Sequence, residues 1–391
     1  MSESLQTSRE GTDLPLAPVR PYNSLYIHIP FCVRQKCDYC AFYSEPHGSP
    51  ALHRQFLSAL ERELARNAPA CQPLRSIFIG GGTPSALAPQ EITRLSRFVH
   101  AILPLAPDCE WTFEANPASL TPARLEAMLA GGANRLSLGI QSFSPRLRRV
   151  LGRRGTLQRL PDILREIRCL PSLRLNLDLI FQIPGESITD WQNDLQRALD
   201  CQPDHLSAYS LIREPGTAFL RRHPDLPEPD DGEFLQFWNL TDKVLATAGL
   251  HRYEISNFAR RGCRCRHNYE IWHGQTYLGC GPAAVSFNGQ NRPANPASLT
   301  AWLQNAPQED DILPAKQRAR EILAFGLRTT DGWNREEFTS LTGYAPEQLA
   351  PQALARLQRA GLLKISPLRL SPTHRGLLVN DGILEQILNE E

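Results

Sequence analysis

The chain has 391 residues, of which 41% are hydrophobic and 21% are charged, and its formal net charge is +1. This balance is ordinary for a globular protein of two or three domains, and it excludes an overall basic field that would draw the chain to nucleic acid or anionic lipid. Residues 1–21 lack the apolar core of a signal peptide and are expected to be a disordered leader. No apolar run is long enough to span a bilayer. Ten cysteines without a secretion signal indicate thiols in a cytoplasmic protein.

The first predicted strand, residues 25–29, runs through Pro30 into a loop that holds Cys32, Cys37 and Cys40. Three thiols within nine residues after a strand indicate a metal site rather than free core cysteines. A structural zinc site is closed by four ligands, so three thiolates better fit a four-iron cluster with one open iron. The C-x4-C-x2-C spacing also matches a plant-type two-iron cluster, which needs a distant fourth cysteine, and spacing leaves this alternative open. The candidates for that fourth ligand are Cys71, Cys109, Cys169, Cys201, Cys263, Cys265 and Cys280.

The chain then alternates between strand and helix patterns. Strands are predicted at 76–80, 111–114, 135–140, 174–180 and 205–211, and helices at 51–67, 89–103, 157–169, 190–200 and 231–249, with another beginning at Thr121-Pro122. Such alternation is typical of a parallel sheet covered by helices. Six strand–helix units are fewer than the eight of a closed barrel. We therefore predict an α/β fold with a partial (β/α)6 barrel over residues 22–250.

Unusual residues gather where the predicted strands end. Gly80-Gly81-Gly82 follows the second strand, Glu114 ends the third, Gln141 follows the fourth, and Asp178 lies within the apolar fifth. Triple glycine suggests close backbone approach to a ligand, and a buried aspartate is rare unless it is paired. In parallel barrels the C-terminal strand ends form the active site, so these residues and the cysteines should converge. A small ferredoxin fold does not explain this arrangement, which favours the four-iron cluster.

Seven segments occur in a characteristic order: YIHIPFC with its two following cysteines, GGGTP, FEANP, NRLSLGIQSF, NLDLIFQIPGE, EPGT and YEISNFA. Over about residues 22–390 this series resembles radical S-adenosylmethionine proteins, in the branch of oxygen-independent coproporphyrinogen III oxidase and its sister family of haem chaperones. The resemblance implies a [4Fe-4S] cluster on Cys32, Cys37 and Cys40, with S-adenosylmethionine chelating the fourth iron. The family spacing is C-x3-C-x2-C, so this chain has one extra residue between Cys32 and Cys37.

The resemblance also implies which residues bind the cofactor. Tyr26, Gly81 and Glu114 match contacts of the first S-adenosylmethionine. The positions that match a second such molecule in the oxidase are Tyr39, Gly82, Thr83, Gln141, Arg153, Asp178 and Ala208, and Val285 matches a further ligand contact.

Two features separate the two branches. The oxidase typically has another cysteine two residues after the third ligand, where this chain has Phe42, as in the chaperone branch. The chaperone signature HNxxYW corresponds to His267-Asn268-Tyr269-Glu270-Ile271-Trp272, with isoleucine at the tyrosine place. The residues by themselves would describe His267 as a capped loop histidine beside a basic run. The resemblance implies His267 as an axial haem ligand and Trp272 as a residue stacked on the macrocycle.

We therefore expect a haem chaperone that carries a [4Fe-4S] cluster and S-adenosylmethionine. It would transfer haem to acceptor proteins, and membrane-associated proteins are one option for these acceptors. The alternative is oxidative decarboxylation of coproporphyrinogen III, so whether the chain is an enzyme stays open.

The pattern changes towards the C-terminus. Residues 251–310 are expected to connect the barrel to a domain at 311–391. Helices are predicted there at 316–327, 335–342, 346–360 and 373–388, with short strands at 362–365 and 368–370. This order resembles an α+β winged-helix domain. It has no strong basic stripe, so no nucleic acid partner is expected, and the domain is expected to cover the barrel mouth.

Overall fold

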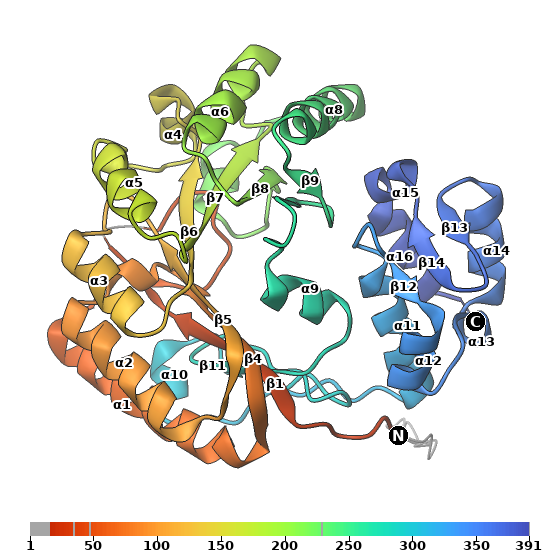
Figure 1. Ribbon diagram of the computed structural model, residues 1–391, viewed down its shortest axis with the longest axis horizontal. Coiled ribbons are helices and arrows are strands. Elements are labelled where there is room, and N and C mark those ends of the chain that lie inside the picture. Colours follow the sequence, from red (N-terminus) through yellow and green to blue (C-terminus); the bar gives the residue numbers. More distant parts are fainter. Residues whose placement is uncertain (1–15, 34–35, 47, 228–229, 391) are drawn as a thin grey trace, which may run out of the picture.

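The computed structural model describes residues 16–33, 36–46, 48–227 and 230–390. Its centre is a curved nine-stranded sheet in the order β11-β1-β4-β5-β6-β7-β8-β10-β9, with helices on its outer face (Figure 1). Six consecutive strands of this sheet are parallel, as the sequence predicted. They are β1 (Tyr22–Ile29), β4 (Cys71–Gly81), β5 (Leu105–Ala115), β6 (Arg135–Gln141), β7 (Arg174–Phe181) and β8 (His205–Ser210).

The helices between these strands begin at side-chain caps in several cases. Ser49 accepts a hydrogen bond from the amide of Leu52, and Thr121 accepts one from Arg124, which confirms the predicted cap before Pro122. The helices are α1 (Pro50–Asn67), α2 (Pro89–Ile102), α3 (Pro122–Ala130), α4 (Pro145–Val150), α5 (Leu160–Arg168), α6 (Ile188–Asp200), α7 (Ala218–Arg222) and α8 (Asp231–Thr247). Short α4 and α7 were not predicted.

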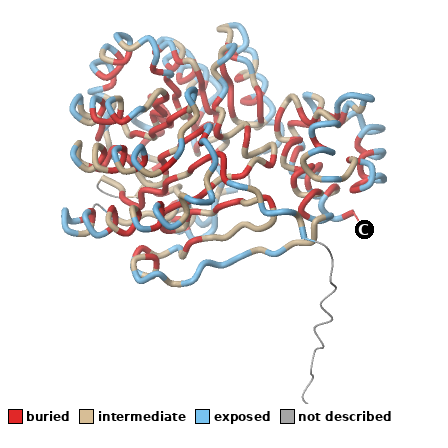
Figure 2. The backbone as a smooth tube through the Cα atoms, turned by 60° about the horizontal axis from the view of Figure 1, so that its bottom comes forward, coloured by how far each residue is buried: buried red, intermediate tan, exposed pale blue. Residues whose placement is uncertain are grey.

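The two faces of the sheet differ in polarity because side chains alternate along each strand. On β1, Leu25 and Ile27 are fully buried in the hydrophobic core beneath the outer helices. Tyr26 and His28 lie on the opposite, concave face. Figure 2 shows the buried strands enclosed by helices whose outer turns are exposed. On each strand, the residues that alternate with the buried core positions therefore share the concave face; they include Tyr26 on β1, Asp178 on β7 and His205 on β8.

Residues 251–310 do more than connect two domains. They supply β9 (His251–Arg252), β10 (Asn257–Ala259) and β11 (Tyr277–Cys280), which extend the main sheet at both edges, together with α9 (Arg266–Trp272) and α10 (Leu299–Leu303). Strand β11 is parallel to β1, and β10 is antiparallel to β8. Runs of two to four residues carry no readable periodicity, which is why these strands were missed.

The predicted disordered leader is wrong for its last part. Residues 1–15 lie outside the described residues, but Arg20 donates its backbone amide to the carbonyl of Asn288 at 2.8 Å and its guanidinium to the carbonyl of Gly274 at 2.8 Å. Tertiary hydrogen bonds therefore hold this segment against the stretches of chain on both sides of β11.

The C-terminal part packs around a second hydrophobic core. Its helices are α11 (Ala315–Gly326), α12 (Arg335–Thr342), α13 (Pro346–Leu349), α14 (Pro351–Arg359), α15 (His374–Leu378) and α16 (Asn380–Leu388), and its sheet contains β12 (Trp333–Asn334), β14 (Arg369–Pro372) and β13 (Leu363–Ile365). Two predicted helices are each divided, one at Ala350 and the other at Val379. The first break has a clear cause, because Ala350 precedes Pro351 and a residue before proline disfavours helical geometry. Among the described residues, no helix has both the length and the apolar composition of a membrane span.

Candidate cofactor site

The triple glycine meets the acidic residue of the neighbouring strand. A Cβ atom built on Gly80 would lie 2.9 Å from Oε2 of Glu114, and one on Gly81 would lie 2.8 Å from the ring of His28. Gly81 also has a φ of +106°, a conformation that side chains disfavour, and its amide donates to the Glu114 carboxylate. A Cβ on Gly82 would lie 2.7 Å from the carbonyl oxygen of Phe31. The glycines therefore permit close approach between β1, β4 and β5 at their C-terminal ends.

Tyr26 and His28 form one hydrogen-bonded pair beside these glycines. The Nε2 atom of His28 lies 2.8 Å from the carbonyl of Tyr43, so it carries the proton and donates. The Nδ1 atom then accepts from the Tyr26 hydroxyl at 3.0 Å. Burial raises the pKa of Tyr26 and lowers that of His28, so both side chains are neutral near pH 7.

Two carboxyl groups share the concave face. Burial, together with the nearby charge of Asp178, raises the pKa of Glu114 to about 8. Asp178 accepts hydrogen bonds from Ser137 at 2.8 Å and from Asn176 at 2.8 Å. Such a pair of carboxyl groups suits a cationic or hydroxyl-bearing ligand.

The cysteine loop is tied to several strand ends. Thr83 Oγ1 lies 4.0 Å from Sγ of Cys32, and the guanidinium of Arg153 lies 3.7 Å from Sγ of Cys37 and also donates to the carbonyl of Gly139. Burial raises the pKa of the Cys40 thiol to about 11, and Cys37 and Cys32 are near enough to contribute. Tyr39 packs against a small apolar cluster formed after β6, β7 and β8.

The three thiols fit an iron–sulfur cluster by the chemistry of the donor set, but they are not yet gathered on one centre. In the parts of the chain that the structure describes, no three Cys, His, Asp or Glu side chains form a metal-binding group. Residues 34 and 35, which belong to the loop between Cys32 and Cys37, lie outside the described residues. Removal of the proton from Cys40 would have to accompany metal binding, since the thiolate is the ligand.

The remaining predicted ligand contacts, Gln141, Ala208 and Val285, lie in three different environments. Gln141 is buried with a φ of +69°, and a Cβ on Gly139 would lie 2.9 Å from its Nε2 atom. Ala208 differs, because its side chain belongs to the hydrophobic core on the helix side of the sheet; any contact there must use the backbone. The carbonyl of Val285 packs on Gly279 of β11, at the edge of the sheet beside β1.

His267 lies inside the molecule rather than on a surface. It is 4% exposed, stacks on Phe78 of β4 with ring centroids 5.2 Å apart, and its Nδ1 atom lies 2.9 Å from Oγ of Ser76. Its Nε2 atom has no hydrogen-bond partner among the residues that the structure describes. Burial lowers the pKa of His267 to about 3, so its imidazole is neutral.

Trp272 lies at the other end of α9, against the C-terminal domain. The guanidinium of Arg328 lies over its ring at 4.4 Å and the ring of Phe325 meets its edge. The Nε1 atom of Trp272 is buried without a partner in the described part of the chain. The structure thus places His267 and Trp272 against different elements and does not bring them together around a common space.

A buried polar group on the concave face was missed in the sequence. It contains Ser137, Asn176, His205 and Tyr253, which form hydrogen bonds with one another or with Asp178. A signal was present: Asn176 and Asp178 alternate with three leucines in an otherwise apolar strand, which places both on one face.

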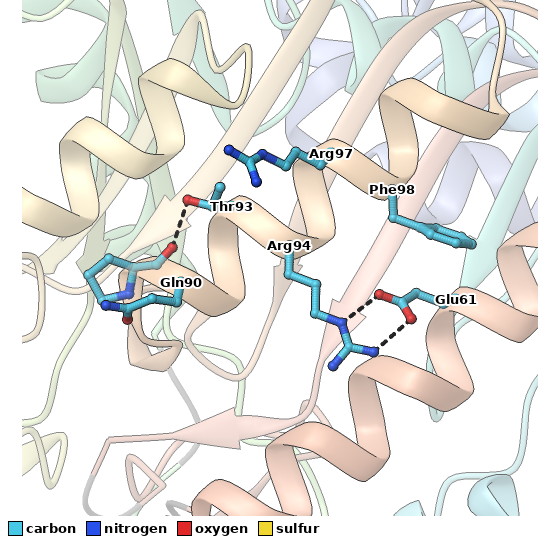
Figure 3. A pocket seen from close by; sticks show the side chains of 7 residues that line it. Glu61, Gln90, Thr93, Arg94, Arg97 and Phe98 are labelled. Atoms are coloured by element: carbon cyan, nitrogen blue, oxygen red, sulfur yellow. Dashed lines mark hydrogen bonds and ion pairs between the residues drawn. The ribbon is translucent and has the colours of Figure 1, made fainter.

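Two surface pockets lie away from the predicted cofactor residues. One of about 720 Å³ lies on the outside between α1 and α2, where Glu61 and Arg94 form an ion pair (Figure 3). Another of about 300 Å³ lies between the barrel and the C-terminal domain, and Asp242 and His374 are among its lining residues. Neither lining includes a predicted cofactor residue.

Comparison with known proteins identifies the family. The model of the Radical SAM superfamily matches residues 26–198, and that of the HemN C-terminal domain matches residues 313–379. The haem chaperone HemW of Escherichia coli is 33% identical, over 95% of this chain and 99% of its own length. The haem chaperone HemW of Bacillus subtilis is 31% identical, over 94% of this chain and 99% of its own.

A solved structure has the same fold. Coproporphyrinogen III oxidase (HemN) from Escherichia coli, described as a radical SAM enzyme, superposes with a TM-score of 0.82 at 23% identity, covering 95% of this chain and 91% of that one. The predicted partial barrel with an additional C-terminal domain is thereby confirmed. Radical S-adenosylmethionine proteins use a [4Fe-4S] cluster and S-adenosylmethionine, and this chain belongs to the HemW family within that superfamily.

Proposed function

We propose that this protein binds haem and transfers it to acceptor proteins, with a [4Fe-4S] cluster on Cys32, Cys37 and Cys40 and S-adenosylmethionine at the concave strand ends. The observation that carries the proposal is similarity to haem chaperones along nearly the whole chain. The acceptors would be cytoplasmic or membrane-associated haem proteins.

The cofactor site is supported by its own chemistry. Glu114, Asp178 and the amides around Gly81 offer acceptors and donors of the kind that an amino acid ligand needs. The guanidinium of Arg153 places a positive charge 3.7 Å from Sγ of Cys37. When bound, the cluster supplies an open iron for the amine and carboxylate of S-adenosylmethionine.

The state of His267 is compatible with haem ligation. If Nδ1 donates to Ser76, Nε2 retains its lone pair, and metal-binding histidines commonly donate their other ring nitrogen in this way. The neutral imidazole required of an iron ligand is the form that burial favours. Because the side chain is 4% exposed, haem would reach it from the concave face or after displacement of α9.

A haem titration tests the proposed function. We expect purified protein to give a Soret band that saturates at one haem per chain, and His267→Ala to change its position and weaken binding about tenfold or more. His251→Ala, which alters an exposed histidine, is the matched control and should bind as the wild type does. Ser76→Ala keeps the imidazole and should shift the band without abolishing it. Absence of saturable binding by the wild type would overturn the proposal, and equal binding by His267→Ala would remove this ligand.

Anaerobic reconstitution tests the cluster separately. We expect about four irons and four sulfides per chain in the wild type, and loss of the cluster in Cys32→Ser, Cys37→Ser and Cys40→Ser. The exposed Cys169→Ser is the control. Retention of the full iron content in all three loop variants would contradict the assignment.

A further inference from the structure

A continuous set of buried hydrogen bonds crosses the concave face from Asp178 to the segment before α9. Asn176 contacts Asp178 at 2.8 Å, the Nδ1 atom of His205 lies 2.7 Å from Oδ1 of Asn176, and the hydroxyl of Tyr253 lies 2.8 Å from Nε2 of His205. The amide of Cys265 reaches the same hydroxyl at 3.4 Å. All four residues beyond Asp178 are at least nine-tenths buried, so water does not supply these bonds.

The donors and acceptors give this set one direction. The backbone amide of Cys265 can only donate, and the carboxyl oxygens of Asp178 accept from Ser137 and Asn176. The Asn176 amide therefore donates to Asp178, its carbonyl accepts from Nδ1 of His205, and Nε2 of His205 accepts from Tyr253. His205 must then be the neutral tautomer with its proton on Nδ1. Reversal of any one bond would leave a buried donor or acceptor unpaired, which costs more than the bond contributes.

A second group of hydrogen bonds, made by Arg135 and Glu110, joins the Cys265 end of this set to α9. Arg135 donates to the carbonyls of Cys263 and Arg264 at 2.9 Å each and to Glu110 at 3.0 Å. Glu110 in turn accepts from the amide of His267 at 3.2 Å. The segment that carries His267 is thus fixed beside Tyr253.

We propose that Tyr253 and His205 are positioning residues that hold Asp178 as an oriented acceptor for S-adenosylmethionine and join it to the segment that carries His267. This inference rests on the proposed function, since it takes Asp178 as a ligand contact. It assigns roles to two residues that touch neither ligand and act through Asn176.

The first test measures the affinity of the reconstituted protein for S-adenosylmethionine by equilibrium dialysis. Tyr253→Phe removes one hydroxyl and should weaken binding about three- to tenfold, the size of one neutral hydrogen bond. Tyr269→Phe is the matched control, because Tyr269 packs near Tyr253 but donates to Asp331; its affinity should stay within about twofold of the wild type. Equal affinity of the two variants would overturn the inference.

Two substitutions of His205 separate its hydrogen bonds from its packing, because one of them restores a donor and an acceptor. His205→Leu removes both the donor and the acceptor, whereas His205→Gln keeps one of each. Binding should fall about tenfold or more with leucine and return to within about threefold with glutamine. Equal loss in both variants would mean that the imidazole acts by packing alone, which contradicts a positioning role.

The second test needs no cofactor. Nitrogen-15 spectra of histidine-labelled, ligand-free protein should show His205 with its proton on Nδ1, and Tyr253→Phe should shift its Nε2 resonance while Tyr269→Phe leaves it unchanged. A proton on Nε2 would overturn the inference whatever the affinities. If the wild type binds no S-adenosylmethionine, the proposed function fails, and these spectra still decide the hydrogen-bond direction.

Discussion

Arg135 on β6 offers a prediction whose magnitude follows from its contacts. Its side chain is 1% exposed, and it pairs with Glu110, which is 7% exposed. Arg135→Met keeps an apolar chain of similar length but leaves the carboxylate without its counter-ion and two carbonyls without donors. Breaking a buried pair in this way costs about 3–5 kcal/mol of unfolding free energy. At about 2 °C per kcal/mol for a large chain, the melting temperature falls by about 6–10 °C.

The assay is urea unfolding of the apo protein followed by tryptophan fluorescence. Arg165→Met is the matched control, since Arg165 and Asp162 form an exposed pair whose side chains are 74% and 65% accessible. Such pairs are worth less than about 1 kcal/mol. The double variant Arg135→Met/Glu110→Gln removes the stranded charge and should recover part of the loss, so the two changes will not add. Equal destabilisation by Arg135→Met and Arg165→Met would refute the reasoning.

Two further predictions concern the strand ends. The raised pKa of Glu114 means that its folded carboxyl binds a proton more tightly than the unfolded one, so its stabilising contribution is complete below its ordinary pKa of 4.5 and is lost as the pH rises through about 8. Glu114→Gln should therefore gain stability over the wild type as the pH rises from about 5 to about 9 in thermal melts; a constant difference would contradict this pKa. Gly81→Ala should cost about 1–3 kcal/mol and lose S-adenosylmethionine binding, because its Cβ meets the His28 ring. Gly361→Ala, with a φ of +69° and open space, is its control and should cost only about 1 kcal/mol.

Many elements of the fold could be predicted from local sequence patterns. The six strands were visible because each is a short apolar run bounded by turn residues, and Thr121 before Pro122 marked a helix start that the structure confirms. The order of the seven sequence motifs indicated the family. Residues spaced along the chain, such as Gly80 and Glu114, could be expected to meet because parallel strands end at one edge.

Other features depended on contacts between distant segments. Strands β9, β10 and β11 are two to four residues long and exist because they pair with the edges of an established sheet. The burial of His267 follows from its packing on Phe78, about 190 residues away in the chain.

The sequence by itself determined the family, the strand–helix alternation and the chemical type of each candidate ligand, because these are local properties of residue order. The tertiary structure decided which of those side chains meet, how they are protonated and which are enclosed. Hydrogen bonds such as those from Asp178 through His205 to Tyr253 join separate strands, and their direction is set only when every donor and acceptor has been placed.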